Sequence, residues 1–464
     1  MLSVLIHTLG CKLNQLESEA ISSAFVRSGF VLTDISGEPS IIVINTCTVT
    51  SKADQKARRV IRKALRDYPD SCVIVTGCYA ELNREDLYKL DTVRGGRLFV
   101  LKGTEKVSVL DLPRYINEKK DIAGALRLLC ENGISAGSEQ KNGEGLIGAF
   151  QFSPERFSNH TRSFLKIQDG CDKHCTYCRI RLARGPCVSL DADEVLDRLR
   201  ILEKSHSEAV LTGVNISQYY DKTRDVNLAA LLEQMLAGTE KIALRLSSLA
   251  PDSIDENLAA VLSHKRIRPH FHLSIQSGSK KILERMGRSY NAQTVEKAAA
   301  LLRRAKGDPF LACDIITGFP GEKNADFNET LELCKKIDFA WIHVFPYSRR
   351  PGTPAWSFAD TVIEKEITKR VQILTNLARQ GRAGYVRRWL GQEVEVLTEK
   401  GNPCRGVLEN YLKLLVYYKG EKASLPGSVL RCKILEKEPH TEARSFMENT
   451  EGRMKDYDAV AEEI

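Results

Sequence analysis

Three cysteines crowd into one short loop of this 464-residue chain. Cys171, Cys175 and Cys178 follow an apolar stretch that ends at Gly170, with three and then two residues between successive cysteines. A loop this tight can place three thiolates on one face of a cubic iron–sulfur cluster, and no fourth cysteine follows at ferredoxin spacing. The fourth iron would then keep an open position at which a substrate can bind.

Other chemistries fit this loop less well. Zinc remains the alternative, because His174 inside the loop could serve as a fourth ligand. A c-type haem needs a histidine directly after the last cysteine, and Arg179 stands there instead. A disulfide is the weakest interpretation, because an odd number of cysteines, thirteen, in a chain without a secretion signal favours metal or redox chemistry.

Composition is that of an ordinary globular protein, with 28% charged and 42% hydrophobic residues. The length allows two or three domains. No apolar run approaches membrane-spanning length, and the first residues form neither a basic leader nor a secretion signal. We therefore expect a cytoplasmic protein.

The net charge of +8 is unevenly distributed. Residues 379–437 hold twelve Lys and Arg against six Asp and Glu, whereas residues 438–464 hold three bases against eight acids. A basic segment of this kind suggests a module that binds a polyanion, although it could also be a solvated surface. The acidic, apolar-poor tail at 438–464 is expected to be disordered.

Residues 1–130 alternate short apolar runs with helix-like stretches, which predicts an N-terminal domain of βα units around a parallel sheet. We expect strands at 3–8, 41–45 and 72–76, and helices at 18–28 and 53–68. Cys11, Cys47 and Cys78 each come two or three residues after one of these strands. Because the carboxyl ends of parallel strands share one edge, the three cysteines could converge there.

A single cysteine in such a place would be an ordinary loop residue, but the same position recurs three times. The remaining cysteines show no ligand spacing and are interpreted as structural: Cys72, Cys130, Cys187, Cys313, Cys334, Cys404 and Cys432.

A glycine-rich linker at 131–157 leads to a second βα series at 158–378. Expected strands lie at 164–168, 209–212, 242–246, 270–275, 310–315 and 341–345, with helices at 191–204, capped by Asp191, and 324–337. Six repeats predict a partial (βα)6 barrel with the three-cysteine loop after its first strand. Barrel enzymes place their chemistry at that end of the strands. Polar or glycine-rich turns recur at the same edge and could contact a ligand: Gly213, Arg245, Ser247, Gln276, Asp314 and Gly318.

A long helix at 362–388 overlaps the start of a third unit at 379–437. Short alternating runs at 392–397, 413–418 and 429–435 predict a small β-barrel of the oligonucleotide-binding kind. Tyr411, Tyr417 and Tyr418 interleave with basic residues, which suits stacking and phosphate contacts on RNA. The same tyrosines could equally fill the core of a small barrel.

Several of these segments together resemble the radical S-adenosylmethionine (SAM) methylthiotransferases over the chain to about residue 437. The matching pieces are TLGCKLNQLESEA (8–20), NTCTVTSKADQKAR (45–58), TGCYAE (76–81), TRSFLKIQDGCDKHCTYC (161–178), HFHLSIQSGS (270–279), DIITGFPGE (314–322), HVFPYSRRPGT (343–353) and GVLENY (406–411). The last piece is similar to part of a TRAM domain, an RNA-binding β-barrel. Two departures are the stretch 179–182, which lacks the family's proline, and 249–251, which lacks an acidic residue before its proline.

The resemblance implies two [4Fe-4S] clusters and SAM as cofactors. Cys171, Cys175 and Cys178 would hold the cluster whose open iron binds SAM, and Cys11, Cys47 and Cys78 the auxiliary cluster whose open iron carries the added sulfur. Tyr177 and the strand-end residues named above would contact SAM, with no catalytic residue beyond the cluster ligands. Reduction of SAM gives a radical that removes hydrogen from adenine C2, and the methylthio group is then transferred to that carbon.

The segments at 8–20 and 45–58 look most like the branch that modifies N6-threonylcarbamoyladenosine at position 37 of tRNA. The implied partners are a tRNA anticodon loop, held partly by the basic helix at 56–66, and an electron donor such as flavodoxin or ferredoxin, while the sulfur source is left open. Alternative substrates are isopentenyladenosine in tRNA or an aspartate of a ribosomal protein. An alternative of another class is a zinc-containing RNA-binding protein without catalysis.

Overall fold

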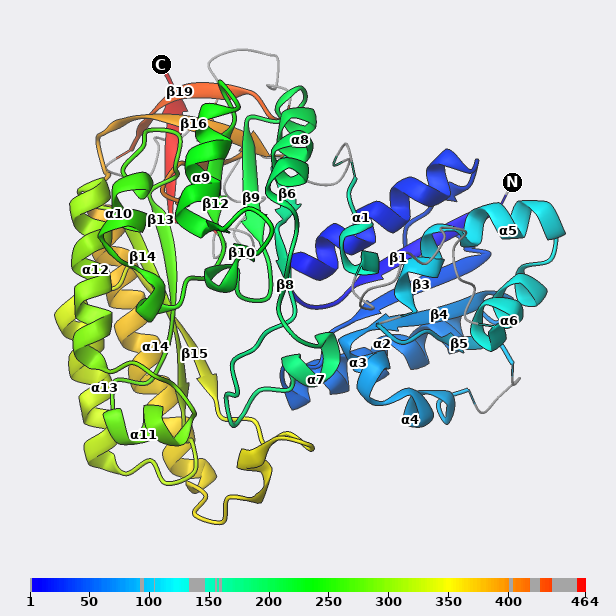
Figure 1. Cartoon of the computed structure of the whole chain (residues 1–464), viewed down its shortest axis with the longest axis horizontal. Helices are drawn as coiled ribbons and strands as arrows, with labels where there is room; N and C mark the ends of the chain where they lie inside the picture. The colour runs from blue at the N-terminus through cyan, green and yellow to red at the C-terminus, as the bar shows by residue number, and fades with distance from the viewer. Residues whose placement is uncertain are drawn as a thin grey trace, which may run out of the picture.

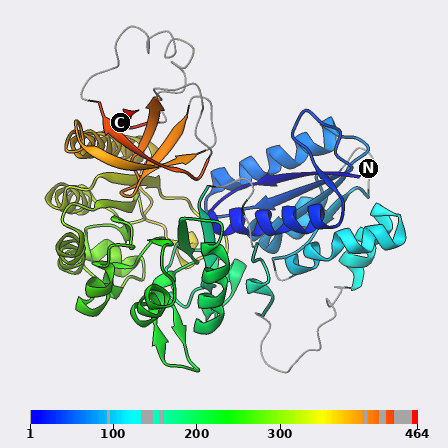
Figure 2. The same cartoon turned by 90° about the horizontal axis from the view of Figure 1, so that it is seen from above.

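A computed structural model of the chain describes residues 2–91, 96–103, 105–132, 147–154, 157, 161–399, 404–417, 426–435 and 457–464. An N-terminal sheet domain lies beside a central curved sheet, and a small β-barrel covers one end of the central part (Figures 1 and 2). Among the helices in these ranges, none combines the length and apolar character needed to cross a membrane. Most of the expected linker at 131–157 lies outside the described residues; a short turn, η2 (Ile147–Phe150), falls within it.

The N-terminal domain is built on a fully parallel sheet in the order β2-β1-β3-β4-β5. Its strands are β1 (Ser3–Thr8), β2 (Val31–Leu32), β3 (Ile41–Thr46), β4 (Cys72–Gly77) and β5 (Leu98–Val100). Its helices are α1 (Lys12–Arg27), α2 (Ser51–Asp67), α3 (Cys78–Leu82), α4 (Arg84–Tyr88), η1 (Lys106–Leu110), α5 (Leu112–Lys119) and α6 (Ile122–Asn132). Helices α1, α5 and α6 cover one face and α2 to α4 the other, so that β3 is buried throughout.

The predicted strands of this domain are confirmed, and α2 closely matches its predicted range. Helix α1 begins earlier than expected, at Lys12. Its first turns carry the buried polar residues Asn14 and Glu17, which break the apolar periodicity that marks a helix in sequence.

The central domain confirms the six predicted parallel strands. They are β6 (Ser163–Lys166), β9 (Glu208–Thr212), β12 (Ala243–Leu246), β13 (His270–Gln276), β14 (Phe310–Thr317) and β15 (Trp341–Pro346). They form two groups of three, β12-β9-β6 and β13-β14-β15, linked by the parallel bridges Leu244–Ile267 and Leu249–Leu273. The result is a partial barrel.

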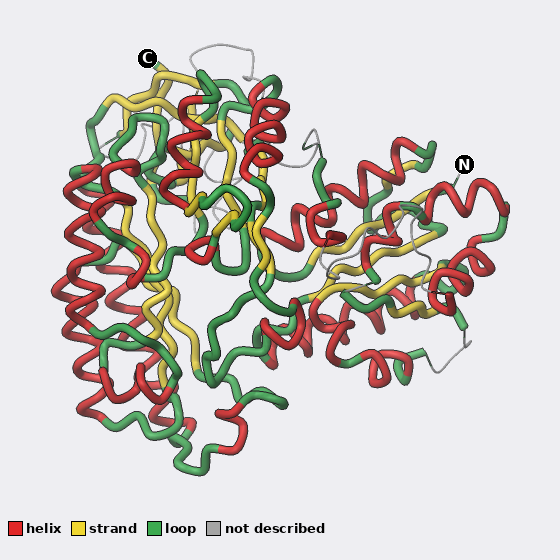
Figure 3. Tube along the Cα trace, viewed as in Figure 1, coloured by secondary structure: helices red, strands yellow, loops and turns green. Residues whose placement is uncertain are grey.

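Helices line the outer side of this curved sheet (Figure 3). They are α8 (Ala192–Glu203), α9 (Leu228–Ala237), α10 (Glu256–Leu262), α11 (Lys280–Arg285), α12 (Ala292–Lys306), α13 (Asn324–Ile337) and α14 (Glu364–Arg387). The predicted cap is confirmed, because the Asp191 carboxylate accepts the backbone N–H groups of Asp193 and Glu194. Smaller elements are β7 (Gln168–Asp169), α7 (Ile180–Arg184), β8 (Val188–Ser189), η3 (Ile216–Gln218), β10 (Tyr220–Asp221), β11 (Val226–Asn227), η4 (Pro251–Ser253) and η5 (Pro354–Ser357).

The two sides of the central sheet differ in chemistry because side chains alternate along each strand. Apolar residues such as Leu211, Leu273 and Ile315 pack against the outer helices. The opposite side carries Glu208, Arg245, His272, Asp314 and His343, some of which pair with one another. The inside of the partial barrel is therefore polar.

The C-terminal unit is a closed barrel in the order β16-β17-β18-β20-β19. Its strands are β16 (Glu393–Glu399), β17 (Arg405–Leu408), β18 (Lys413–Tyr417), β19 (Val429–Ile434) and β20 (Ala459–Glu463). Its apolar core continues onto Phe310 and Ala340, at and just before the start of central strands, which places the barrel at the amino ends of the central sheet.

Two predicted boundaries need correction. The domain boundary at 378/379 falls inside the continuous helix α14. The tail at 438–464 was expected to be disordered, but its residues 459–463 form β20, which lies between β18 and β19 and closes the barrel. Ala461 in that strand is fully buried, so two small apolar residues among acids are enough to anchor it. The rest of the expected tail, up to residue 456, lies outside the described residues.

A buried arginine fastens the central domain to the N-terminal domain. Arg350, in the loop after β15, lies 2.6 Å from the Asp54 carboxylate and donates to the hydroxyl of Thr48 at 2.8 Å. The same loop accepts the backbone N–H of Ser51 on the hydroxyl of Ser348. The Arg350 side chain is 4% exposed, so its partners replace water almost completely.

We expect Arg350→Ala to destabilise the docking of these two domains by about 3–5 kcal/mol, because the Asp54 carboxylate would stay buried without its partner. Urea unfolding of the apoprotein, followed by circular dichroism, measures the loss. Arg66→Ala, which removes an exposed arginine of α2, is the control and should leave the transition unchanged. Equal transitions for both variants would contradict this role of Arg350.

Candidate cluster-binding site

The three-cysteine loop lies between β7 and α7, at the carboxyl end of the first central strand. Backbone bonds hold it in place: the N–H of Cys171 donates to Gly185 O, and that of Thr176 to Met286 O. Burial, together with the nearby thiols of Cys175 and Cys171, raises the pKa of Cys178 to about 12. The three sulfurs are therefore close enough to influence one another.

An arginine reaches this loop from the far side of the barrel. Arg288 donates to Cys175 Sγ at 3.2 Å and to the carbonyl of Ser274 at 3.0 Å. Cys171 Sγ lies 3.1 Å from the side-chain oxygen of Gln218. The cysteines open onto a cavity of about 150 Å³, which is lined by Cys171, Lys173, Cys175, Tyr177, Cys178, Ile180, Arg181, Val214, Asn215, Ser248, Ala250, Ser274, Gln276 and Arg288.

Two of the seven residues predicted to contact SAM, Tyr177 and Gln276, line this cavity. Gly213 and Ser247 do not, although their neighbours Asn215 and Ser248 do. Gly213 allows close packing instead, since a Cβ there would come within 2.8 Å of Gln168 Oε1.

Asp314, Gly318 and Arg245 also lie outside the cavity lining. The Asp314 carboxylate is 3.1 Å from the imidazole of His272. Gly318 has φ +79°, and a Cβ there would collide with Ile367 of α14, so packing explains this glycine.

Of the residues predicted to contact SAM, Arg245 differs most clearly from its predicted role. Its guanidinium is fully buried and lies 2.6 and 3.0 Å from the two carboxylate oxygens of Glu208, near the barrel residue Tyr411. Because Arg245 pairs with a buried carboxylate and lies near Tyr411, it stabilises the contact between the central sheet and the C-terminal barrel. Burial alone would raise the pKa of Glu208, but Arg245 lowers it to about 2.

The pKa of Glu208 in the folded protein lies below its ordinary value of 4.5. The ion pair of the Glu208 carboxylate therefore contributes its full stabilisation above pH 4.5. We expect this contribution, on the order of 2–3 kcal/mol, to be lost as the pH falls toward 2. Urea unfolding of the apoprotein at pH 6 and pH 3 measures it. Glu208→Gln should be less stable at pH 6 and lose less on acidification, and an acid response equal to that of the wild type would contradict this linkage.

The three N-terminal cysteines converge at one edge of their sheet, as predicted. Cys11 precedes α1, Cys47 follows β3 and Cys78 begins α3. Burial, with the neighbouring thiols of Cys78 and Cys11, raises the pKa of Cys47 to about 11. Gly10 makes this approach possible, because a Cβ at that position would lie only 2.5 Å from the Cβ of Cys47.

Asn14 ties two of these cysteine loops together. Its side-chain amide donates to Leu9 O at 2.7 Å and to Thr46 O at 3.0 Å, one carbonyl in the segment before Cys11 and the other directly before Cys47. Its oxygen accepts a bond from Arg184 of α7 at 3.1 Å. The geometry of the N-terminal cysteines therefore depends on a side chain from the central domain.

Arg184 belongs to a buried network of five charges between the two domains. Its guanidinium donates to Cys78 Sγ at 3.3 Å and lies 3.2 Å from Glu17 and 3.1 Å from Asp169. Lys106 pairs with Glu17, and Lys166 with Asp169. Burial would raise the pKa of both carboxyls, but Arg184 and the lysines hold the pKa of Glu17 well below its ordinary value and lower that of Asp169. Three cations face two carboxylates, so a positive charge is left over beside the Cys78 sulfur.

The residues present fit iron–sulfur clusters. Each group offers three cysteines from loops at a sheet edge, with an arginine directed at one sulfur. Over the described ranges, no three His, Cys, Asp or Glu side chains are arranged around a single metal ion. A cluster needs a wider arrangement, because each cysteine binds a different iron.

Sequence reasoning missed Asn14, Glu17, Arg184 and Arg288. Asn14 and Glu17 carry no recognisable signal, because polar residues at helical spacing look like an exposed face in the sequence, although the structure buries both. Arg184 and Arg288 carry none, because their partners are distant in the sequence.

Comparison with known proteins agrees with this geometry. The family model "Radical SAM superfamily" matches residues 165–334, and "Uncharacterized protein family UPF0004" matches residues 3–95. The chain is 37% identical to the threonylcarbamoyladenosine tRNA methylthiotransferase MtaB of Treponema pallidum (strain Nichols), over 94% of this chain and 98% of that protein. The chain belongs to the radical SAM methylthiotransferases.

The MtaB protein of Bacillus subtilis (strain 168) is 34% identical over 94% of each chain. Among solved structures, the radical SAM methyltransferase TsrM of Kitasatospora setae aligns with a TM-score of 0.52 at 16% identity, over 76% of this chain and 74% of that one. That likeness concerns the fold. Membership of the methylthiotransferases implies a [4Fe-4S] cluster and SAM as cofactors.

The resemblance predicts a cluster at the N-terminal cysteines of this methylthiotransferase, and we expect Arg184→Gln to lower its midpoint potential. The substitution removes a positive charge and a hydrogen bond from Cys78 Sγ, both of which favour the reduced state. A redox titration followed by electron paramagnetic resonance measures the shift, in a background where Cys171, Cys175 and Cys178 are alanine. Arg62→Gln, an exposed cation of α2, is the control, and equal potentials for both variants would contradict the role of Arg184.

Proposed function

We propose that this chain is a tRNA methylthiotransferase that adds a methylthio group to C2 of N6-threonylcarbamoyladenosine at position 37. The observation that carries the proposal is the convergence of two three-cysteine groups across one domain interface. Helix α7 begins two residues after Cys178, and its last residue, Arg184, touches Cys78 Sγ. Five helical residues span about 8 Å, so α7 brings the two groups close to one another. The names of the relatives supply the substrate.

In this proposal Cys171, Cys175 and Cys178 hold one [4Fe-4S] cluster, and Cys11, Cys47 and Cys78 hold a second. When bound, the clusters and SAM would supply the one-electron chemistry needed to replace an unreactive aromatic C–H bond by a carbon–sulfur bond. The chain itself orients the groups: Arg288 and Arg184 each donate to one ligand sulfur. Tyr177 and Gln276 would border SAM in the cavity beside the first group.

A basic groove beside the interface would hold the RNA backbone. It encloses about 590 Å³ between α2 and the loop after β15, and Arg58, Arg62, Arg179 and Arg349 contribute to its lining. Trp356 borders the groove with 44% of its surface exposed, and the Arg349 guanidinium stacks over its ring. Arginines with an exposed aromatic ring suit a single-stranded loop, whose phosphates and splayed bases need both kinds of contact.

The proposal includes an external one-electron donor such as flavodoxin or ferredoxin and a cytoplasmic location, where tRNA is modified. The source of the sulfur is left open. Isopentenyladenosine is the second substrate to be tried, because it occupies the same position of tRNA.

The decisive experiment is iron and acid-labile sulfide analysis of the anaerobically reconstituted protein and of a variant with Cys11, Cys47 and Cys78 changed to Ala. We expect about eight irons per chain in the wild type and about four in the variant. The variant should still cleave SAM but add no methylthio group to tRNA, as measured by mass spectrometry of nucleosides.

Full iron content in the triple variant would refute the second cluster, and zinc in place of iron would support the non-catalytic alternative. Parallel assays on tRNA with threonylcarbamoyl- or isopentenyladenosine distinguish the two substrates. Product only on the isopentenyl substrate would overturn the substrate assignment while leaving the chemistry intact.

A further inference from the structure

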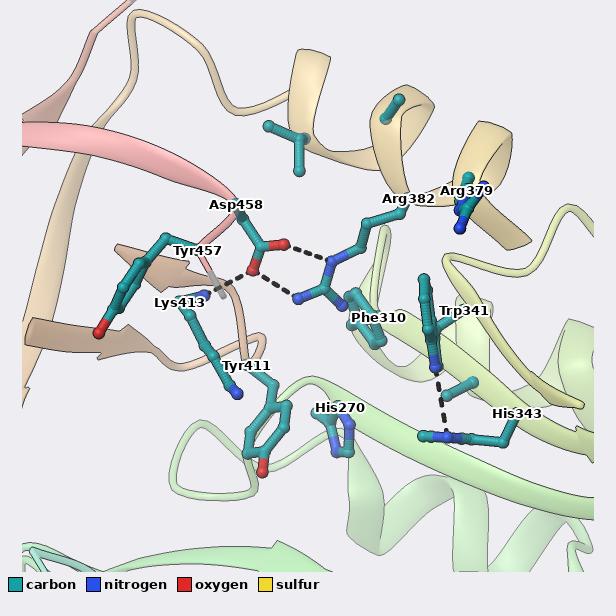
Figure 4. A pocket seen from close by; sticks show the side chains of 13 residues that line it. His270, Phe310, Trp341, His343, Arg379, Arg382, Tyr411, Lys413, Tyr457 and Asp458 are labelled. Atoms are coloured by element: carbon teal, nitrogen blue, oxygen red, sulfur yellow. Dashed lines mark hydrogen bonds and ion pairs between the residues drawn. The ribbon is translucent and has the colours of Figure 1, made fainter. Parts of the chain in front are cut away.

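A second, larger cavity lies where the central sheet, helix α14 and the C-terminal barrel meet (Figure 4). It encloses about 730 Å³ and is lined by His270, Phe310, Ala312, Trp341, His343, Arg379, Arg382, Ala383, Val386, Tyr411, Lys413, Tyr457 and Asp458. These residues belong to three parts of the chain: the central strands (270–343), helix α14 (379–386) and the C-terminal barrel (411–458). The cavity exists only when barrel and central domain are docked.

Aromatic rings form one wall of this cavity. His270 stacks on Phe310, with centroids 5.4 Å apart and planes at 22°, and also contacts Tyr411 at 4.6 Å. Trp341 donates its indole N–H to His343 at 3.3 Å. Trp341, His343 and Phe345 alternate along β15, so they share its inner face, where Phe345 is 39% exposed. This row of rings runs from the cavity toward the cysteine loops.

The cations that line the cavity differ in whether they are paired. Arg382 already has a partner, because its guanidinium makes a two-point contact with the Asp458 carboxylate, at 2.6 Å. Within the described part of the chain, the side chains of Arg379 and Lys413 have no ion-pair partner. Two cations at the rim of an aromatic cavity can bind an anion.

His270 supplies an independent sign of a missing ligand. The residue is 7% exposed, and its Nδ1 is buried without a hydrogen-bond partner among the described residues. A buried nitrogen without a hydrogen-bond partner destabilises the fold, and a ligand group that bonds to it would relieve this. Its imidazole lies against the cavity beside Tyr411 (Figure 4).

The cavity communicates with the cysteine site through the polar inner face of the sheet. Ser248, which lines the small cavity, lies 2.7 Å from His272 Nδ1. The His272 ring is 5.2 Å from that of His343, which lines the large cavity. The His272 imidazole therefore lies between residues that line the two cavities, so a nucleotide in the large cavity would lie along the same polar face as the cysteine site.

We propose that this cavity binds an unpaired nucleotide of the RNA substrate that neighbours the modified adenosine. Its base stacks on Trp341 and His343, and His270 Nδ1 bonds the base edge or the ribose. The phosphates on the two sides of the nucleotide bind Arg379 and Lys413, which lie on opposite sides of the cavity (Figure 4). Base–aromatic stacking with a cationic rim is the means by which proteins hold single-stranded nucleic acid. This inference rests on the proposed RNA substrate and adds the place where a second nucleotide is held.

The test measures the affinity of the reconstituted full-length protein for anticodon stem-loop RNAs by fluorescence anisotropy. One RNA is intact, and each of the others lacks a single loop base. Trp341→Ala should weaken binding of the intact RNA about ten-fold or more, in line with about 1–3 kcal/mol per stacked base. One of these RNAs lacks the base that stacks on Trp341. For that RNA alone, Trp341→Ala should cause no further loss of affinity.

Lys413→Ala should weaken binding of every RNA and reduce the slope of log affinity against log salt by nearly one. Trp341→Phe should restore most of the affinity, and iron content and SAM cleavage show that the variants fold. Tyr220→Ala and Lys336→Ala, which remove exposed residues elsewhere, are the controls and should bind like the wild type.

Unchanged affinity in Trp341→Ala, or the same loss with every base-free RNA, would overturn the nucleotide site while leaving the proposed function standing. If the wild type binds none of the stem-loops and modifies no tRNA, the proposed function fails together with this site.

Discussion

The contact between Arg184 and Cys78 joins the parts of the molecule that carry the chemistry. Arg184 and the four other charged side chains of its network are each no more than 8% exposed. Removing such charges from water costs several kcal/mol each, and only close mutual pairing offsets the cost. Glu17 pairs with Lys106 inside the N-terminal domain, and Asp169 pairs with Lys166 inside the central domain. Arg184 joins the two pairs, because it lies 3.1 Å from Asp169 and 3.2 Å from Glu17. Docking therefore gives Arg184 its second carboxylate, and it aligns the two cysteine groups.

A second polar system supports the opposite end of the central domain. Glu208 receives Arg245 and Arg268, and Arg245 also lies against Tyr411 of the C-terminal barrel. The partial barrel is thus apolar outside, where helices cover it, and polar inside, where the flanking domains dock. This arrangement leaves the interior available for a charged substrate, which an apolar interior would reject.

Periodicity and cysteine spacing predicted most of the architecture. The central strands, the Asp191 cap and the convergence of Cys11, Cys47 and Cys78 follow from local patterns, and the structure confirms them. The role of Arg245 was mispredicted, because a strand-end arginine looks the same whether it meets a ligand or a distant Glu208. Strand β20 was missed because the eight acids of residues 438–464 outweigh its three apolar residues in composition. Cys78, Cys175 and Asp54 lie 106, 113 and 296 residues from Arg184, Arg288 and Arg350 respectively, and such distances leave no local trace in the sequence.

The position of β20 has a consequence for how the protein is made. The strand lies between β18 and β19, although those two precede it by more than twenty residues in the chain. During translation the barrel stays open until residues 458–463 have left the ribosome, and until then Arg382 also lacks its partner Asp458. A nascent chain can therefore fold its cysteine-bearing domains before the barrel closes. The cysteine-bearing domains could therefore take up metal before the protein is able to bind RNA.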